Sequence, residues 1–346
     1  MSFGRIILLI NILLLFVASV FFVFGEKIEL YWYAKKNVGA EKFIYIPTGA
    51  TLGAITKILE REKILEDTTL FRQLAQQKNY LGKNIVSGKY RIEKYFTYNH
   101  LVNTLRAGRG ALQVKIHLHN IKNLAELAEK VGLELEPNAT AFLEYFSQPL
   151  TAEKYGLTSE NILTLFLEDT YFFDWNTSPI AFAERMYKEH RNFWNKKRME
   201  RAAQLDLSPS QVMILASIVQ AEQEFHADEQ PIIAGLYINR LRQGMKLQAD
   251  PTIKFLLKDP SIKRILNKHL TIKHPYNTYQ NRGLPPGPIN LPNKKAIDAV
   301  LYYQKHNYIY MCAMPGYSGK HLFASSYTQH IKNAKEYTQW LDQQKK

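Results

Sequence analysis

The feature that most constrains this chain is an uninterrupted apolar segment near its amino terminus. Residues 6–24 contain no charged side chain, and with Gly25 they would form a helix of roughly 30 Å, one hydrocarbon thickness of a bilayer. A cleaved signal peptide would have a shorter apolar region and a small-x-small cleavage site, and neither is evident. We therefore predict an uncleaved transmembrane anchor over residues 6–25, preceded by a short segment of residues 1–5. Basic residues flank the segment on both sides, so charge bias does not fix its orientation.

Composition bounds what the rest of the chain can be. A chain of 346 residues with 46% hydrophobic residues can bury a sizeable core and has the length of about two domains. Its net charge of +14 predicts attraction to an anionic partner, which is nucleic acid, lipid headgroups or an acidic polymer. The single cysteine, Cys312, excludes an intrachain disulfide, and we interpret it as a core residue.

Nothing in the sequence calls for a metal or a nucleotide cofactor. The HExxH, paired CxxC, GxxxxGK[ST] and strand-linked GxGxxG motifs are all missing. His117 and His119 would share one strand face, but without a third ligand they are better explained as surface residues.

The hydrophobic periodicity predicts an α+β fold with two folded parts. Residues 41–110 read as a small βααβα module, with strands at 43–46 and 87–94 and helices at 52–59, 67–77 and 97–108. Residues 111–346 read as a larger mixed α/β domain. It opens with a strand at 112–118, contains an aromatic loop and one long basic helix between residues 167 and 202, and ends in strands near 308–314 and 321–325 and a helix over 326–344.

One predicted helix of the larger domain carries a carboxylate on the wrong face. In "ILASIVQAEQEF", at about 100° per residue, Glu222 lies within about 40° of Leu215 and Ile218, on the apolar face. Burial there disfavours the charged carboxylate and raises its pKa, which is the condition for a general acid near neutral pH. The alternative is a glutamate at the edge of the core whose head reaches water, or Arg240 or Arg242 on the next helix.

Two polar loops follow this helix. "INRLRQGMKLQADPT" carries Asn239, Gln248 and Asp250, and "HPYNTYQNRGLPPGPI" carries Asn277 and Tyr279 beside a proline-stiffened turn. Rigid loops with amides, hydroxyls and tyrosines are suitable walls for a carbohydrate groove. Each loop is equally well explained as a connector with capped turns, and the aspartate before proline as a turn residue.

Taken together, these motifs carry a family resemblance. "LASIVQAE", "PIIAGLYINRLRQGMKLQADPT", "PYNTY", "GLPPGPI" and "HLF", in this order, closely resemble the MltG (YceG-like) family of endolytic murein transglycosylases. The resemblance runs over roughly residues 41–340 and is most specific between 215 and 289. "FIYIPTGATLGAITKIL" resembles the LysM-like subdomain of that family, so residues 41–110 are expected to be LysM-like and residues 111–346 to be the catalytic domain.

The resemblance implies an activity and a set of site residues. Such enzymes cleave peptidoglycan strands internally between N-acetylmuramic acid and N-acetylglucosamine and leave 1,6-anhydro ends, which is thought to terminate nascent strands. One glutamate, here Glu222, protonates the bridging oxygen and then acts as base on the C6 hydroxyl, so a second carboxyl group is not required. No cofactor or metal is implied. We expect the groove to be lined by residues that position the sugar or orient the acid: Asn239, Gln248, Asp250, Asn277, Tyr279 and His321. Leu284 and the neighbouring prolines are expected to form a wall.

The resemblance also implies a location and partners. The catalytic domain would lie outside the cytoplasmic membrane, with residues 1–5 inside, and the partners would be peptidoglycan strands, the membrane, and glycan polymerases and transpeptidases. The negative charges of peptidoglycan and of anionic lipids in the membrane would attract the basic chain.

Two departures leave alternatives open. Relatives commonly read "IVEKE", whereas this chain has Gln220 at the first acidic position and Glu222 at the second; if the acid belonged to the first position, the chain would be inactive. "HLHNIKN" lacks the acidic residue and glycine that relatives tend to have after this strand, which concerns the domain junction. A non-catalytic wall-binding scaffold is the main rival function. Nucleic-acid binding is disfavoured by the anchor and by the lack of a base-reading motif.

Overall fold

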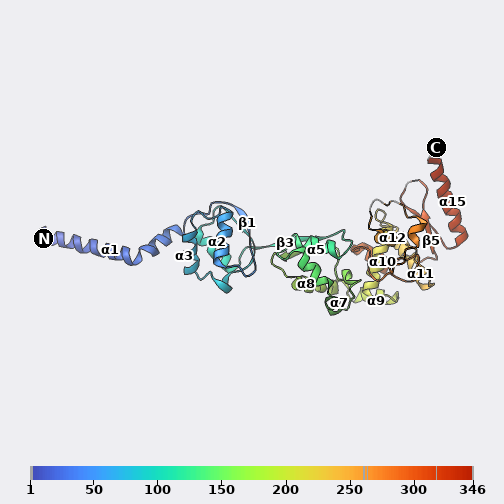
Figure 1. The fold of residues 1–346 in the computed structure, drawn as a ribbon, viewed down its shortest axis with the longest axis horizontal. Helices are drawn as coiled ribbons and strands as arrows, with labels where there is room; N and C mark the ends of the chain where they lie inside the picture. Colours follow the sequence, from blue (N-terminus) through green and yellow to red (C-terminus); the bar gives the residue numbers. More distant parts are fainter. Residues whose placement is uncertain (1–2, 260–261, 263, 317, 345–346) are drawn as a thin grey trace. The chain divides into compact units, whose positions relative to one another are not determined.

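The computed structural model describes residues 3–259, 262, 264–316 and 318–344. They fold into two compact units, Met1–Val114 with Phe172–Thr177, and Lys115–Tyr171 with Ser178–Lys346 (Figure 1). Each unit is described by itself below.

The first unit has the predicted βααβα order after an amino-terminal helix, α1 (Phe3–Tyr33). Its elements are β1 (Lys42–Ile46), α2 (Leu52–Arg61), α3 (Thr68–Gln77), the 3-10 turn η1 (Gly82–Asn84), β2 (Gly88–Ile92) and α4 (Tyr98–Ala107). The predicted ends of α4 are confirmed, because Thr97 Oγ1 accepts the backbone N–H of His100 at 3.1 Å and Gly108 is left-handed at φ 64°.

Strands β1 and β2 pair antiparallel, with Tyr45 opposite Lys89. Their inward side chains, Ile44, Ile46, Tyr90 and Ile92, form one core with buried residues of α2, α3 and α4. The four-stranded sheet has the order β1-β2-β3-β4, with β3 at Ala111–Leu118 and β4 at Asp169–Asp174.

Strand β4 corrects the prediction of an aromatic loop at this point. Tyr171 and Phe173 are 6% and 5% exposed, whereas Phe172 between them is 52% exposed, so the aromatic run has the two-residue period of a strand.

The second unit is mainly helical and ends in a β-hairpin and a helix. Its elements after β3 are α5 (Leu124–Gly132), α6 (Ala139–Ser147), α7 (Pro149–Lys154), η2 (Ile162–Leu165), α8 (Pro179–Phe193), α9 (Lys196–Gln204), α10 (Pro209–Glu222), α11 (Gln230–Arg242), α12 (Asp250–Leu257), α13 (Asn267–Leu270), α14 (Lys294–Leu301), β5 (Tyr310–Ala313), β6 (His321–Ala324) and α15 (Tyr327–Gln344).

The predicted long basic helix is two helices, which is a second correction. The chain leaves α8 at Trp194, and the side chain of Asn195 caps α9 by accepting the backbone N–H of Arg198 at 3.1 Å.

Among the described residues, no single helix combines the length and the apolar character needed to cross a bilayer. A shorter apolar stretch, Leu9–Val20, lies within α1, and the bent pair α9 and α10 reaches the required length and composition only jointly. The anchor at residues 6–25 therefore stays a prediction.

Helix α10 is the centre of the second unit. It starts with a reciprocal capping box between Ser208 and Gln211, and every residue from 212 to 219 is buried. It packs against α9, α11, α12 and α14 (Figure 1). This packing fixes the carboxyl end of α10, and with it Glu222.

Candidate active site

Glu222 is the last residue of α10, and its side chain enters a hollow of roughly 200 Å³. The other lining residues come from α11, from the loop before α12 and its first residue, from the loop between α13 and α14, and from the β5–β6 hairpin: Leu236, Tyr237, Arg240, Leu247, Gln248, Asp250, Tyr279, Met311, Cys312, Ala313 and His321. The hollow thus gathers Glu222 and four of the six predicted groove residues, Gln248, Asp250, Tyr279 and His321. Cys312, which we expected in the core, is half-buried in its wall.

The surroundings of Glu222 keep its proton available. The pKa of Glu222 is raised from its ordinary value to about 7, mainly by loss of hydration, and the nearby charge of Asp250 acts in the same direction. The hydroxyl of Tyr237 donates a 2.6 Å hydrogen bond to Oε1 of Glu222 and opposes this rise, since it favours the charged form. The group is therefore balanced between acid and base near neutral pH.

Neither arginine of α11 neutralises Glu222. Arg240 is only 7% exposed and directs its guanidinium to the carbonyl oxygens of Ile309 and Leu247, both at 2.6 Å. Arg242 donates to the hydroxyl of Tyr303 at 3.0 Å. No described residue forms an ion pair with Glu222, so the alternative of a core-edge glutamate paired with arginine does not hold.

The two polar loops predicted from the sequence meet at a buried hydrogen-bonded cluster formed by Thr252, Thr278 and the backbone of Ala249, called the knot below. Thr278 Oγ1 lies 2.9 Å from Thr252 Oγ1 and accepts the backbone N–H of Ala249 at 3.0 Å. The knot brings Gln248 and Asp250 beside Tyr279, whose hydroxyl donates to Oδ1 of Asp250 at 2.6 Å. Gln248 takes the left-handed conformation at φ 51°, an unusual one for a residue other than glycine.

His321 enters the hollow from the first position of β6. Its Nδ1 lies 3.0 Å from Oε2 of Glu229, and its backbone N–H donates to Oε1 of the same carboxylate at 3.1 Å. Glu229, which caps the start of α11, is 5% exposed.

Asn239 and Asn277, which the sequence predicts in the groove, do not line this hollow. The amide of Asn239 donates to the carbonyl oxygens of His306 and Tyr308 at 2.8 and 3.0 Å. Asn277 is fully buried, and its amide donates to the carbonyl oxygen of Ile272 at 2.7 Å. Both side chains satisfy backbone carbonyl groups, and they thereby hold the neighbouring loops in place.

The positions of Gln220 and Glu222 in the structure differ. Its Oε1 accepts the backbone N–H of Asn293 at 2.8 Å, just before α14. The side chain of Gln220 therefore holds the start of α14 against α10. Of the two positions, 220 and 222, only Glu222 lines the hollow.

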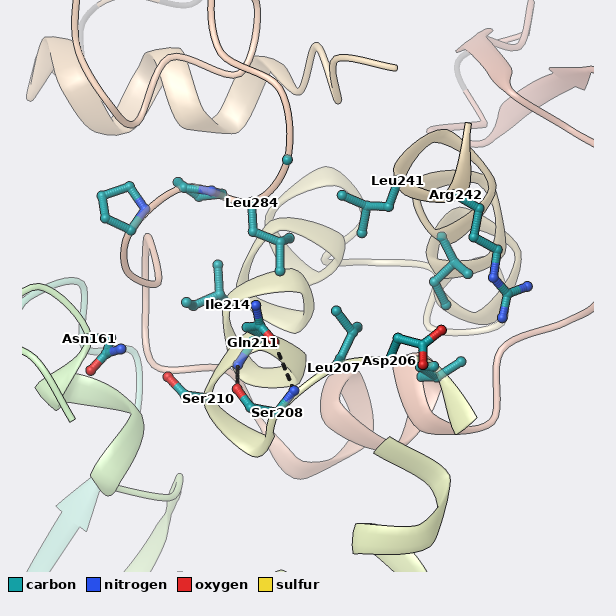
Figure 2. A pocket seen from close by; sticks show the side chains of 15 residues that line it. Asn161, Asp206, Leu207, Ser208, Ser210, Gln211, Ile214, Leu241, Arg242 and Leu284 are labelled. Carbon is teal, nitrogen blue, oxygen red and sulfur yellow. Dashed lines mark hydrogen bonds between the residues drawn. The ribbon is translucent and has the colours of Figure 1, made fainter. Parts of the chain in front are cut away.

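A larger hollow of roughly 700 Å³ lies at the opposite end of α10 (Figure 2). Figure 2 shows Leu284 above Ile214, with the capping pair Ser208 and Gln211 below. The one carboxylate among its lining residues, Asp206, is exposed, so this hollow is lined by no buried acid. Leu284, Pro285 and Pro286, which were expected to form a wall of the groove, border this space and do not line the hollow that holds Glu222.

Tyr237 is the site residue that the sequence reading missed. It follows Ile233 and Ala234 at helical spacing and is 1% exposed. A tyrosine on a buried helix face needs a hydrogen-bond partner for its hydroxyl, and this was the available signal.

Within the described part of the chain, no group of three or more His, Cys, Asp or Glu side chains is placed to hold a metal ion. His117 instead contacts Thr170 Oγ1 at 2.8 Å, and His119 pairs with Glu168 at 3.1 Å.

Comparisons with known proteins agree with this architecture. A family model described as the YceG-like family matches residues 44–336. A Bacillus subtilis protein named endolytic murein transglycosylase is 26% identical over 312 residues, covering 85% of this chain and 84% of that protein. A Streptococcus pneumoniae protein of the same name is 24% identical over 323 residues, and the match spans 84% of this chain but only 57% of that longer protein. The α+β fold matches the crystal structure of a YceG-like protein from Listeria monocytogenes with a TM-score of 0.54 and 24% identity, over 84% of this chain and 98% of that one. By the extent of the family match, the chain belongs to the YceG-like family.

Proposed function

We propose that this protein is a lytic transglycosylase that cleaves peptidoglycan strands internally. The observation that carries the proposal is the placement of Glu222, a carboxyl group with its pKa raised to about 7 and oriented by Tyr237 in a hollow lined by polar side chains. The names of the Bacillus and Streptococcus relatives support the same activity.

The proposed reaction needs one acid at the start. Glu222 gives its proton to the oxygen that bridges N-acetylmuramic acid and N-acetylglucosamine, and the bond from C1 to that oxygen breaks. The C6 hydroxyl of the same muramic acid then bonds to C1 and loses its proton to a base in the site. The product is a 1,6-anhydro end, and no water is consumed.

Ordinary hydrolysis is the second candidate, because Asp250 places another carboxylate in the same hollow. A glycosidase uses such a second group as nucleophile or as base for water. Asp250 is exposed and already accepts the hydroxyl of Tyr279, which favours a positioning role.

We also propose that residues 6–25 anchor the chain in the cytoplasmic membrane with the catalytic domain outside. The uncharged run of residues 6–24 supports the anchor, and the net charge of +14 suits an acidic wall polymer. Residues 41–110 would be a LysM-like module, and glycan polymerases and transpeptidases would be the partners whose strands the enzyme terminates.

Digestion of purified sacculi by the detergent-solubilised full chain tests the activity. Mass spectrometry should find anhydro-muropeptides with the wild type and none with Glu222→Gln. Glu224→Gln is the matched control, because Glu224 is an exposed carboxylate two residues further on. Reducing ends without anhydro ends would indicate a hydrolase, and no cleavage by the wild type would indicate the wall-binding scaffold.

A further inference from the structure

The imidazole of His321 lines the same hollow as Glu222, and behind it lies the carboxylate of Glu229. Glu229 is buried and receives three N–H groups: the amide of Gln223 at 2.8 Å, the backbone of His321 at 3.1 Å and Nδ1 of His321 at 3.0 Å. Oε2 of Glu229 already accepts the amide of Gln223 and Oε1 accepts the backbone N–H of His321, so we assign Nδ1 of His321 as the donor of this contact.

This pairing leaves Nε2 as the ring nitrogen available to a ligand. His321 lines the hollow that contains Glu222, and no described residue forms a hydrogen bond with its Nε2. A buried carboxylate behind Nδ1 fixes the imidazole tautomer with its lone pair on Nε2, and it stabilises the imidazolium that forms when Nε2 takes a proton.

The hairpin that carries His321 is fastened to the segment after α10. The amide of Gln223 donates to the carbonyl oxygen of Gly319 at 2.8 Å, and Nε2 of His226 lies 2.7 Å from the carbonyl oxygen of Ser318. Since Gln223 directly follows Glu222, these two hydrogen bonds tie the hairpin of His321 to the end of the helix that holds the acid. The neighbouring ion pair of Lys320 and Asp228, at 2.8 Å, lies near the surface and is not part of this link.

We propose that His321, supported by Glu229, is the base that removes the proton from the attacking sugar hydroxyl. The inference rests on the proposed function and divides its two proton transfers between two residues. Glu222 protonates the bridging oxygen as its bond to C1 breaks. The hydroxyl oxygen bonds to C1, and its proton passes to Nε2 of His321. The imidazolium then returns that proton to solvent, and Glu222 takes one from solvent, so the enzyme is restored.

Kinetics with the full chain test this division of roles. His321→Ala should lower kcat by about a hundredfold or more with little change in KM, since a lost general base costs about 10²- to 10⁴-fold. Added imidazole should restore a large part of the lost rate by occupying the vacated space. Glu229→Gln should lower kcat by a comparable factor, because the amide no longer stabilises the imidazolium.

Lys320→Gln is the matched control, because it breaks the neighbouring ion pair with Asp228 on the same hairpin but leaves the His321–Glu229 pair in place. It should keep kcat within about twofold, as expected for an exposed pair.

The pH profile supplies a second readout. If Nε2 of His321 accepts the proton, the pH–rate profile of the wild type should contain an acid limb that the profile of His321→Ala lacks. The charged groups that share the hollow are Glu222, Asp250 and Arg240, with Glu229 behind the ring and Lys320 beside it.

Three results would overturn the proposal: a folded His321→Ala that keeps wild-type kcat, a loss that imidazole does not restore, or an equal loss in Lys320→Gln. Each of these leaves Glu222 as the sole acid and base. Activity of Glu222→Gln is a different outcome, which would contradict the proposed function itself.

Discussion

The hydroxyl of Tyr237 lies 2.6 Å from Oε1 of Glu222 and donates a hydrogen bond to it across helices α10 and α11. With Oε1 engaged, Oε2 is the carboxyl oxygen left to carry the transferable proton. Burial and this hydrogen bond act on the pKa of Glu222 in opposite directions, and burial is the larger effect.

Tyr237→Phe should therefore change both the rate and its pH dependence. Removing the donor destabilises the charged carboxylate, so the pKa of Glu222 should rise above about 7 and the alkaline limb of kcat/KM should move to higher pH. The freed carboxyl group should also lower kcat by about ten- to a hundredfold, since small misplacements of a catalytic group are costly. A pH series of anhydro-end release measures both effects. An alkaline limb that moves to lower pH would contradict this account.

Glu222→Gln should stabilise the folded protein at neutral pH while removing activity. The native state binds more protons than the unfolded state between the ordinary pKa of 4.5 and about 7, so the free energy of unfolding of the wild type falls as pH rises through this window. At pH 7.5 the variant should be more stable by about 1–3 kcal/mol, and the gain should vanish near pH 4. Urea unfolding at the two pH values checks this. An equal difference at both values would show that charge burial is not the cause.

The local elements were predictable because their signals are local. Thr97 caps the helix that was predicted over residues 97–108, and β1 has the alternation of exposed and buried residues expected of the strand predicted at 43–46. Glu222 was found because an acid among apolar residues on one helix face is visible on a helical wheel. The break at Asn195 was missed although asparagine is a strong cap, because basic residues at helical spacing continue on both sides.

The partners of the site residues depend on tertiary packing, so they were not predictable. The sequence does not show whether the amide of a polar loop residue faces a ligand site or a backbone carbonyl group. In the structure, the amide of Asn277 donates to a backbone carbonyl oxygen, whereas Gln248 lines the hollow. The approach of residues 304–306 to α11, where a Cβ on Gly235 would lie 2.5 Å from the carbonyl oxygen of Gln304, likewise shows only in three dimensions. That approach supplies the carbonyl oxygen of His306 to the amide of Asn239.

Thr278→Val should loosen the knot that positions Gln248 and Asp250. Thr278 is 1% exposed, and a methyl group in place of its hydroxyl leaves the backbone N–H of Ala249 without its acceptor. We expect a loss of about 1–3 kcal/mol in the free energy of unfolding and a higher KM for glycan strands. Thr278→Ser keeps the hydroxyl and should lie much closer to the wild type. Equal losses in the two variants would assign the effect to packing of the methyl group.

Gln220→Glu tests which position of this helix holds the acid. The side chain at 220 accepts the backbone N–H of Asn293, and a carboxylate can accept the same bond, so the variant should fold normally. Its activity should stay within about twofold of the wild type, because position 220 does not line the hollow. In the double variant Gln220→Glu with Glu222→Gln, activity should remain absent.

Gln220→Leu serves as the structural control. It leaves the backbone N–H of Asn293 without its partner and should lower the free energy of unfolding by about 1–3 kcal/mol. Anhydro-end release from sacculi and urea unfolding measure the two properties separately. Restored cleavage in the double variant would move the catalytic acid to position 220 and refute the assignment of Glu222.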